Sequence, residues 1–383
     1  MKRAWIAGAC LLAGACARDV SQRYELDGLT VIEDFDQPIC AGTFPYFERR
    51  LRWLEQETGL TRDPREPIYH WLREPSEHSP CGLLIGCAKG RDFYGELIAF
   101  SHELVHAHLY QLGSPRPWLS EGMAVMLEDE RNGAPHPSFT PSVLVAIDKP
   151  REVDYDAAGA FTTYLRDRYG MGLLLDYYEA SADTDAAMSI VVFGDVFGDS
   201  FAAVEADYLD GGVLDTSGSL DCDKPDVAWA AETWEHTFRL VCDEPDTIGP
   251  QVSFNDDAPG TYLWSTVVVT VPAGWLSLSL DASGPTWISL LQCDGDESVY
   301  IDAGQPDAQV KLAGGRYLVY ADAFADEEAT ARVTARRLPV APVSGQQGAA
   351  PGLPSHGTGR SRATPCSAEA ISRHMCSASP VRR

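Results

Sequence analysis

The amino-acid sequence predicts an α+β domain followed by an all-β sandwich. Segments with strand and helix character alternate over the first part of the chain, and long helical segments follow them. Beyond the glycine pair Gly211-Gly212 the texture changes to short β-rich runs. The 383-residue chain is long enough for two domains that each bury a core.

The first part of the chain combines a small sheet with helices. The helix prediction for residues 43–60 rests on Phe47, Leu51 and Leu54, which recur at helical spacing, and on Gly59, which suits a helix end. The segments expected in order are a strand at 24–34, that helix, a strand at 66–74, a strand or turn at 86–95, and a helical stretch from 154 to 209.

Beyond Gly212 the runs are short, rich in β-forming residues, and separated by Gly, Pro and Asp. Leu276, Leu278 and Leu280 alternate with serines at period two, as in a half-buried strand. Several such runs at short spacing predict a sandwich. The segment from Pro339 onward has few large apolar residues and is expected to be disordered. The expected boundaries are 1–16 for a signal peptide, 17–212 for the α+β domain, 213–338 for the sandwich and 339–383 for the tail.

The N-terminal residues 1–16 are typical of an export signal. Two cations precede an apolar run that is too short to span a bilayer as a permanent helix. Small residues directly before Cys16 resemble the lipobox of bacterial lipoproteins, although Ala13 stands where leucine is usual. This resemblance implies acylation of Cys16, which would hold the protein on a membrane surface. Because Ala17 follows the cysteine, it further implies the outer membrane of a Gram-negative bacterium; plain secretion is the alternative.

The charge balance is strongly acidic, with 56 acidic and 30 basic residues and a net charge of −26. Such a field repels nucleic acid, which we exclude as a partner. A well-solvated surface is the simplest interpretation of this acidity.

The cysteines are disulfide candidates if the chain is exported. Cys81 and Cys87 are spaced to close a small loop. The spacing fits no four-cysteine zinc site, and it does not give the connectivity. The other candidates are Cys222 and Cys242, which flank a segment of the second half, and Cys40 and Cys293, which have no local partner in the sequence.

The segment HELVH, residues 102–106, places two histidines and a glutamate within five residues. On a helix, His102 and His106 lie one turn apart on the same face, which is a geometry that a tetrahedral zinc ion accepts. Glu103 lies near that face, where its carboxylate can reach a water on the metal. Neighbouring apolar residues make this a half-buried helix. Hydrogen-bonded core imidazoles are the structural alternative, but this spacing with the glutamate between favours a metal.

A third ligand is available in WLSEGMA, residues 118–124. A catalytic zinc ion takes three protein ligands and keeps one position open. We expect Trp118 to start a second helix with Glu121 in its first turn, and a helix that crosses the first could aim this carboxylate at the two imidazoles. The alternative is a first-turn glutamate that interacts only with the helix dipole.

These motifs resemble those of the gluzincins, the zinc peptidases whose third ligand is a glutamate on the following helix. The resemblance covers residues 22–210 and is sharp only in HELVH and WLSEGMA. It implies a zincin-like fold, a zinc ion (Zn²⁺) held by His102, His106 and Glu121, and Glu103 as the general base. It also implies that the strand within residues 86–95 borders the substrate cleft.

The sequence departs from the resemblance at one supporting position. Thermolysin-like members have an aspartate four residues after the ligand glutamate, which orients a histidine, and here that position is Val125. Glu128 or Asp129 could take this role, and the sequence does not decide between them.

Tyr155 is a further candidate for the site. Aminopeptidase-like gluzincins carry a tyrosine, followed closely by a small residue and a helix, whose hydroxyl binds the developing oxyanion. Tyr155 with Gly159 looks similar, although its spacing from Glu121 is shorter than in those enzymes. Packing at a helix end is the alternative, and it is the expectation for Tyr164, Tyr169, Tyr177 and Tyr178.

The remaining histidines of this region are not expected to bind the metal. His108 lies about 200° around the helix from His106 and is expected to be structural. His70, His78 and His136 have no ligand spacing and are expected at the surface.

The sequence therefore predicts zinc-dependent hydrolysis of a peptide or protein substrate at the cell envelope, with Glu103 moving the proton of the attacking water. The β-rich runs resemble the sandwich modules that follow the catalytic domain in secreted bacterial peptidases. Two other functions stay open: a catalytically inactive zinc-binding envelope lipoprotein that acts as a binding or adhesion module, and an adhesin or carbohydrate binder without a metal.

Overall fold

The computed structural model describes most of the chain between residues 21 and 339. The described ranges are 21–34, 37–62, 65–72, 80–82, 84–128, 138–211, 220–229, 232–252, 261–293, 295, 297–303, 307–324 and 328–339. The signal segment with Cys16, and the tail beyond residue 339, lie outside these ranges.

A five-stranded sheet forms the base of the first part. Its order is β1 (Gln22–Leu26), β2 (Leu29–Glu33), β3 (Ile68–Trp71), β5 (Asp92–Gly95) and β4 (Gly86–Lys89). The three middle strands are parallel, and the edge strands β1 and β4 run antiparallel to their neighbours. Residues 24–34, expected as one strand, form a hairpin because Gly28, at φ 82°, turns the chain.

Two helices pack against this sheet and each other through aromatic rings. Helix α1 (Thr43–Thr58) connects β2 to β3, and α2 (Phe100–Leu109) follows β5 through a short 3-10 turn. The rings of Phe47 on α1 and Phe100 on α2 stack at a centroid distance of 4.0 Å. Both side chains are fully buried, so this aromatic contact helps to hold α2 over the sheet.

Helices α3 to α8 form the rest of the first part. They are α3 (Pro117–Leu127), α4 (Pro141–Val145), α5 (Tyr155–Tyr169), α6 (Met171–Ala180), α7 (Ala186–Phe197) and α8 (Phe201–Gly211). Gly122 allows α3 and α5 to approach closely, because a Cβ atom there would lie 2.7 Å from the carbonyl oxygen of Ala158. Among the described residues, no single helix has the length and apolarity to cross a membrane, whereas the bent pair α7 and α8 together has both.

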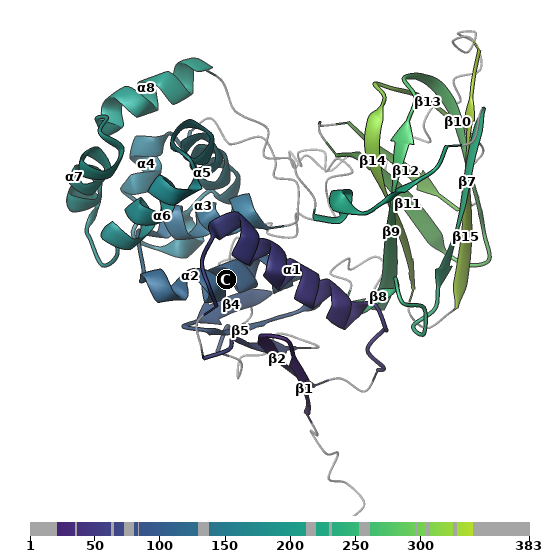
Figure 1. Ribbon diagram of the computed structural model, residues 1–383, viewed down its shortest axis with the longest axis horizontal. Helices are drawn as coiled ribbons and strands as arrows, with labels where there is room; N and C mark the ends of the chain where they lie inside the picture. The colour runs from purple at the N-terminus through teal and green to yellow at the C-terminus, as the bar shows by residue number, and fades with distance from the viewer. Residues whose placement is uncertain are drawn as a thin grey trace, which may run out of the picture.

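The second part is made of two antiparallel-rich sheets that face each other (Figure 1). One has the order β13 (Ala308–Leu312), β10 (Gly274–Ala282), β15 (Ala329–Arg337) and β7 (Thr233–Leu240). The other has the order β12 (Ser298–Asp302), β11 (Thr286–Gln292), β14 (Gly315–Phe324), β9 (Thr261–Val271) and β6 (Asp226–Val227), with β8 (Ile248–Val252) also on β9. As the alternation predicted, Leu276, Leu278 and Leu280 are buried. The architecture is compatible with the predicted α+β part followed by a sandwich.

Three disulfides are present among the described residues, which is consistent with an exported protein. Cys81 pairs with Cys87, as their spacing indicated. Cys222 and Cys242 do not pair with each other. The other two bonds are Cys222–Cys293 within the sandwich and Cys40–Cys242, which links the two parts of the chain.

Candidate metal centre

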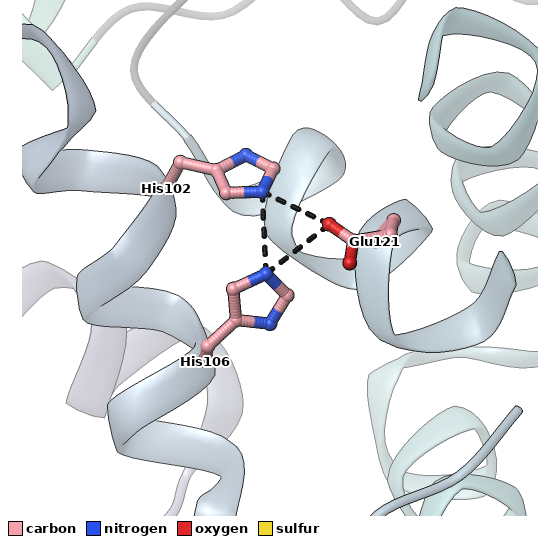
Figure 2. A group of neighbouring side chains, drawn as sticks. All are labelled: His102, His106 and Glu121. Carbon is pink, nitrogen blue, oxygen red and sulfur yellow. Dashed lines mark hydrogen bonds and ion pairs between the residues drawn. The ribbon is translucent and has the colours of Figure 1, made fainter. Parts of the chain in front are cut away.

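Helices α2 and α3 bring together the three residues that the sequence indicated as ligands (Figure 2). The Nε2 atoms of His102 and His106 lie 3.2 Å apart. Each lies 3.2 Å from the Oε2 atom of Glu121. All three side chains are largely buried, so they form a compact triangle of two imidazole nitrogens and one carboxylate oxygen.

The triangle fits a tetrahedral ion. With zinc–ligand bonds of about 2.0–2.1 Å, neighbouring ligand atoms of a tetrahedral site lie about 3.3 Å apart. The observed separations of 3.2 Å agree with this value. Three protein ligands are typical of a catalytic zinc site, whereas structural sites use four. The structure thus shows a buried group that can hold a metal ion.

A second layer of hydrogen bonds fixes both imidazole rings. His102 Nδ1 lies 2.7 Å from Glu128 Oε2, and His106 Nδ1 lies 3.2 Å from Ser120 Oγ. A proton on each Nδ1 leaves each Nε2 free to bind a metal. Of the two residues that the sequence offered for the orienting role, Glu128 makes this contact, and Asp129 lies outside the described residues. Glu128 directly follows Leu127, the last residue of α3.

The start of α3 differs from the expectation by one residue. Pro117 occupies its first turn, where a proline loses no intrahelical hydrogen bond, and the helix therefore begins before Trp118. Glu121 consequently lies beyond the first turn. The helix dipole acts most strongly within that first turn. The alternative of a glutamate that only caps the dipole does not apply.

The electrostatics of the site favour a cation. Burial alone would lower the pKa of His102, but its hydrogen bonds to Glu121 and Glu128 raise it well above the usual range. Burial alone would raise the pKa of Glu121, but the neighbouring His106 and His102 lower it. Together with Glu103, three carboxylates surround two imidazoles, and a divalent ion would balance this excess of negative charge.

Glu103 lies beside the triangle and against the edge strand β4. Its side chain is buried, and its Oε2 atom has no hydrogen-bond partner among the described residues. Burial raises its pKa, and the nearby His106 and His102 oppose that shift. A Cβ atom on Gly86 of β4 would lie 2.8 Å from Glu103 Oε1, so only glycine fits there. The strand that the resemblance placed at the cleft thus directly contacts the candidate base.

Tyr155, the first residue of α5, also reaches the site. Its ring stacks on that of His102 at a centroid distance of 5.6 Å and an interplanar angle of 16°. Burial raises the pKa of its hydroxyl, and the charges of Glu121 and Glu103 raise it further. The group therefore stays protonated at neutral pH and can act as a hydrogen-bond donor.

Tyr178 on α6 contributes to the site although the sequence indicated only packing. It is buried, burial raises its pKa to about 12, and its hydroxyl hydrogen-bonds Ser120, which in turn contacts His106. The sequence carries no local signal for this contact, since it joins helices that are distant along the chain.

The remaining histidines of this part lie away from the metal ligands, one as predicted and one not. His108 is buried, as expected for a structural residue, with Nε2 2.9 Å from Thr58 Oγ1, and burial lowers its pKa to about 4. The surface prediction for His70 is wrong: it is half-buried on an inner strand, and its ring stacks on Tyr94 at 4.2 Å. His78 and His136 lie outside the described residues.

Comparison with known proteins adds little. No family model and no curated protein matches this chain. A solved structure titled as TmCBM61 in complex with β-1,4-galactotriose aligns with 27% of this chain and 88% of its own, at 12% identity and a TM-score of 0.17. A family two carbohydrate esterase from Cellvibrio japonicus aligns over 28% of this chain and 34% of its own, at 17% identity and a TM-score of 0.15. FeII HppE aligns over 46% of this chain and 97% of its own, at 11% identity and a TM-score of 0.14. Likenesses this weak carry no argument.

Proposed function

We propose that this chain is a zinc-dependent peptidase of the gluzincin type, with a zincin-like catalytic part, that acts at the cell envelope. The observation that carries the proposal is the convergence of His102, His106 and Glu121 with Glu103 beside them, whose Oε2 atom has no partner in the part of the chain that the structure describes. A structural metal site would need no such base. Two imidazoles and one carboxylate are also a ligand set that catalytic zinc uses.

A zinc ion held by His102, His106 and Glu121 would supply Lewis acidity and would lower the pKa of water to about 7. Glu103 accepts the proton of the attacking water and returns it to the leaving amine. The pKa of Glu103 is raised toward neutral pH, which suits a group that must both take and give a proton. Tyr155 donates a hydrogen bond to the oxyanion that develops on the scissile carbonyl.

The position of β4 supports a peptide substrate. It is the terminal strand of the five-stranded sheet, so its outer edge can pair with an extended peptide. Gly86 places bare backbone next to Glu103, and a peptide paired there would pass the base. The Cys81–Cys87 disulfide closes the loop that leads into this strand. A lipid on Cys16 would hold the site near envelope proteins and peptides.

The experiment is a cleavage assay on a mixed peptide library with the mature chain, which begins at Cys16, loaded with zinc. Glu103→Gln is the matched variant, because it keeps the size of the side chain while removing the base. We expect wild-type turnover, a loss of about 10²- to 10⁴-fold in the variant, and equal zinc content in both. Equal turnover in both would refute the role of Glu103. Zinc binding without any turnover would favour the inactive binding protein.

A further inference from the structure

The sandwich contributes directly to the core beneath the metal site. Ile248 on β8 and Trp264 on β9 are 1% and 8% exposed, and both belong to the buried cluster that contains Phe47 and Phe100. In Figure 1 one end of α1 lies beside β8. The two parts therefore share one core, unlike domains joined only by a linker.

The sandwich also holds the residues that lead into α1. The backbone N–H groups of the three residues just before this helix, Cys40 to Gly42, bond to carbonyl oxygens of β8 and of the turn between β7 and β8. A Cβ atom on Gly42 would lie 2.7 Å from the Thr247 carbonyl oxygen, so the two backbones touch. The Cys40–Cys242 disulfide closes the same junction. The bonds run from Cys40 N to Gly249 O (3.1 Å), from Ala41 N to Cys242 O (2.8 Å) and from Gly42 N to Thr247 O (2.9 Å).

A short chain of contacts leads from this junction to the metal ligands. The ring of Trp264 meets that of Tyr46 on α1 edge to face, at a centroid distance of 5.4 Å. The hydroxyl of Tyr46 lies 3.1 Å from Ser101 Oγ, and both groups are buried. Ser101 directly precedes His102 on α2. The backbone that presents the first ligand is thus held through Tyr46 by a tryptophan of the sandwich.

We propose that Trp264 and Tyr46 are positioning residues for the metal site, and that the sandwich is an internal brace for α2 rather than an independent binding module. Without Trp264, α1 loses its support at Tyr46 and α2 gains freedom at Ser101. The distance between His102 and Glu121 then fluctuates more, and the metal is held less tightly. This inference rests on the metal site of the proposed function, and it does not depend on peptide hydrolysis.

The test compares Trp264→Ala with Trp264→Phe, which keeps an aromatic ring against Tyr46. Trp234→Ala is the control, because Trp234 is also a buried tryptophan but belongs to the separate core between the two sheets. Hydrogen exchange of residues 100–109 is measured on metal-free protein, and zinc affinity is measured by competition with a chelator. We expect Trp264→Ala to speed exchange in α2 and to weaken zinc binding by about 2- to 30-fold. Trp264→Phe should restore most of both, and Trp234→Ala should lower the melting temperature alone.

Unchanged exchange in α2 together with unchanged zinc affinity in Trp264→Ala would overturn the inference. An equal loss in Trp234→Ala would also overturn it, since the effect would then be general destabilisation. If Trp264→Ala does not fold, Tyr46→Phe removes only the hydroxyl that contacts Ser101, and the same two measurements decide. A wild type that binds no zinc would refute the proposed function, whereas the exchange data would still show whether Trp264 braces α2.

Discussion

Replacing Glu128 is the sharpest test of how the metal site is supported. Its carboxylate lies 2.7 Å from His102 Nδ1, and exposure of the two side chains is only 13% and 11%. A short, buried, charge-assisted hydrogen bond of this kind is stronger than a neutral one. Loss of such an outer partner lowers metal affinity by about 10- to 100-fold, which corresponds to about 1.4–2.7 kcal/mol of binding free energy.

The assay is zinc competition against a chelator of known affinity, with Glu128→Ala and Glu128→Gln measured beside wild type. We expect the full loss in Glu128→Ala and a smaller loss in Glu128→Gln, because an amide oxygen can still accept the His102 proton without the charge. Glu152→Gln is the control, since Glu152 is a surface residue paired with Lys149. Wild-type affinity in Glu128→Ala would show that Glu128 does not set the tautomer of His102.

Three further predictions follow from the same structure. Tyr155→Phe should lower kcat by about 10²- to 10³-fold with little change in zinc affinity, as measured by steady-state kinetics and chelator competition; an unchanged kcat would return Tyr155 to a packing role. Burial lowers the pKa of His108 to about 4, so between pH 6.5 and 4 the unfolded chain binds a proton at this residue and the folded chain does not. Wild type should therefore lose up to about 3 kcal/mol of stability as the pH falls from 6.5 to 4. His108→Gln should lack that part of the pH dependence in denaturant unfolding, and parallel curves would contradict the assignment. From loop-closure entropy, the Cys40–Cys242 disulfide, with a separation of 202 residues, should stabilise by about 5 kcal/mol, and Cys81–Cys87, with a separation of 6, by about 2 kcal/mol. Replacing both cysteines of the first bond by serine should therefore lower the unfolding free energy more than the same change at the second, and equal losses would refute this ranking.

The ligands could be predicted because local geometry fixes them. His102 and His106 are one helical turn apart, so their relative position follows from the helix alone. Glu121 required one further assumption, that the next helix crosses back, and its position along α3 was uncertain by one residue because Pro117 begins that helix. Glu128 was one of two candidates, and the sequence alone could not choose it because it lies just past the end of α3, where helical periodicity no longer applies.

The contacts between distant segments that support the metal ligands could not be predicted. Ser120 meets Tyr178, and Tyr46 meets both Ser101 and Trp264, across long stretches of sequence, and no local pattern encodes such pairs. The same holds for the disulfides: the short Cys81–Cys87 loop was visible in the spacing, whereas the two long-range bonds depend on how the sheets stack. A change in texture at Gly212 suggested two independent units, but it carried no information on their shared core.

The arrangement of these supports explains how a metal-binding triangle can exist in a folded chain. The three ligand atoms, two imidazole nitrogens and one carboxylate oxygen, lie 3.2 Å from one another. Their lone pairs would repel in a buried site unless protons or a cation lay between them. Helices α2 and α3 alone could relieve this by moving apart. Glu128 and Ser120 hold the rings, and the sandwich holds α2 through Tyr46. A cation that binds the folded site and not the unfolded chain should stabilise the whole chain, sandwich included, by an amount that grows with the ratio of free metal concentration to Kd.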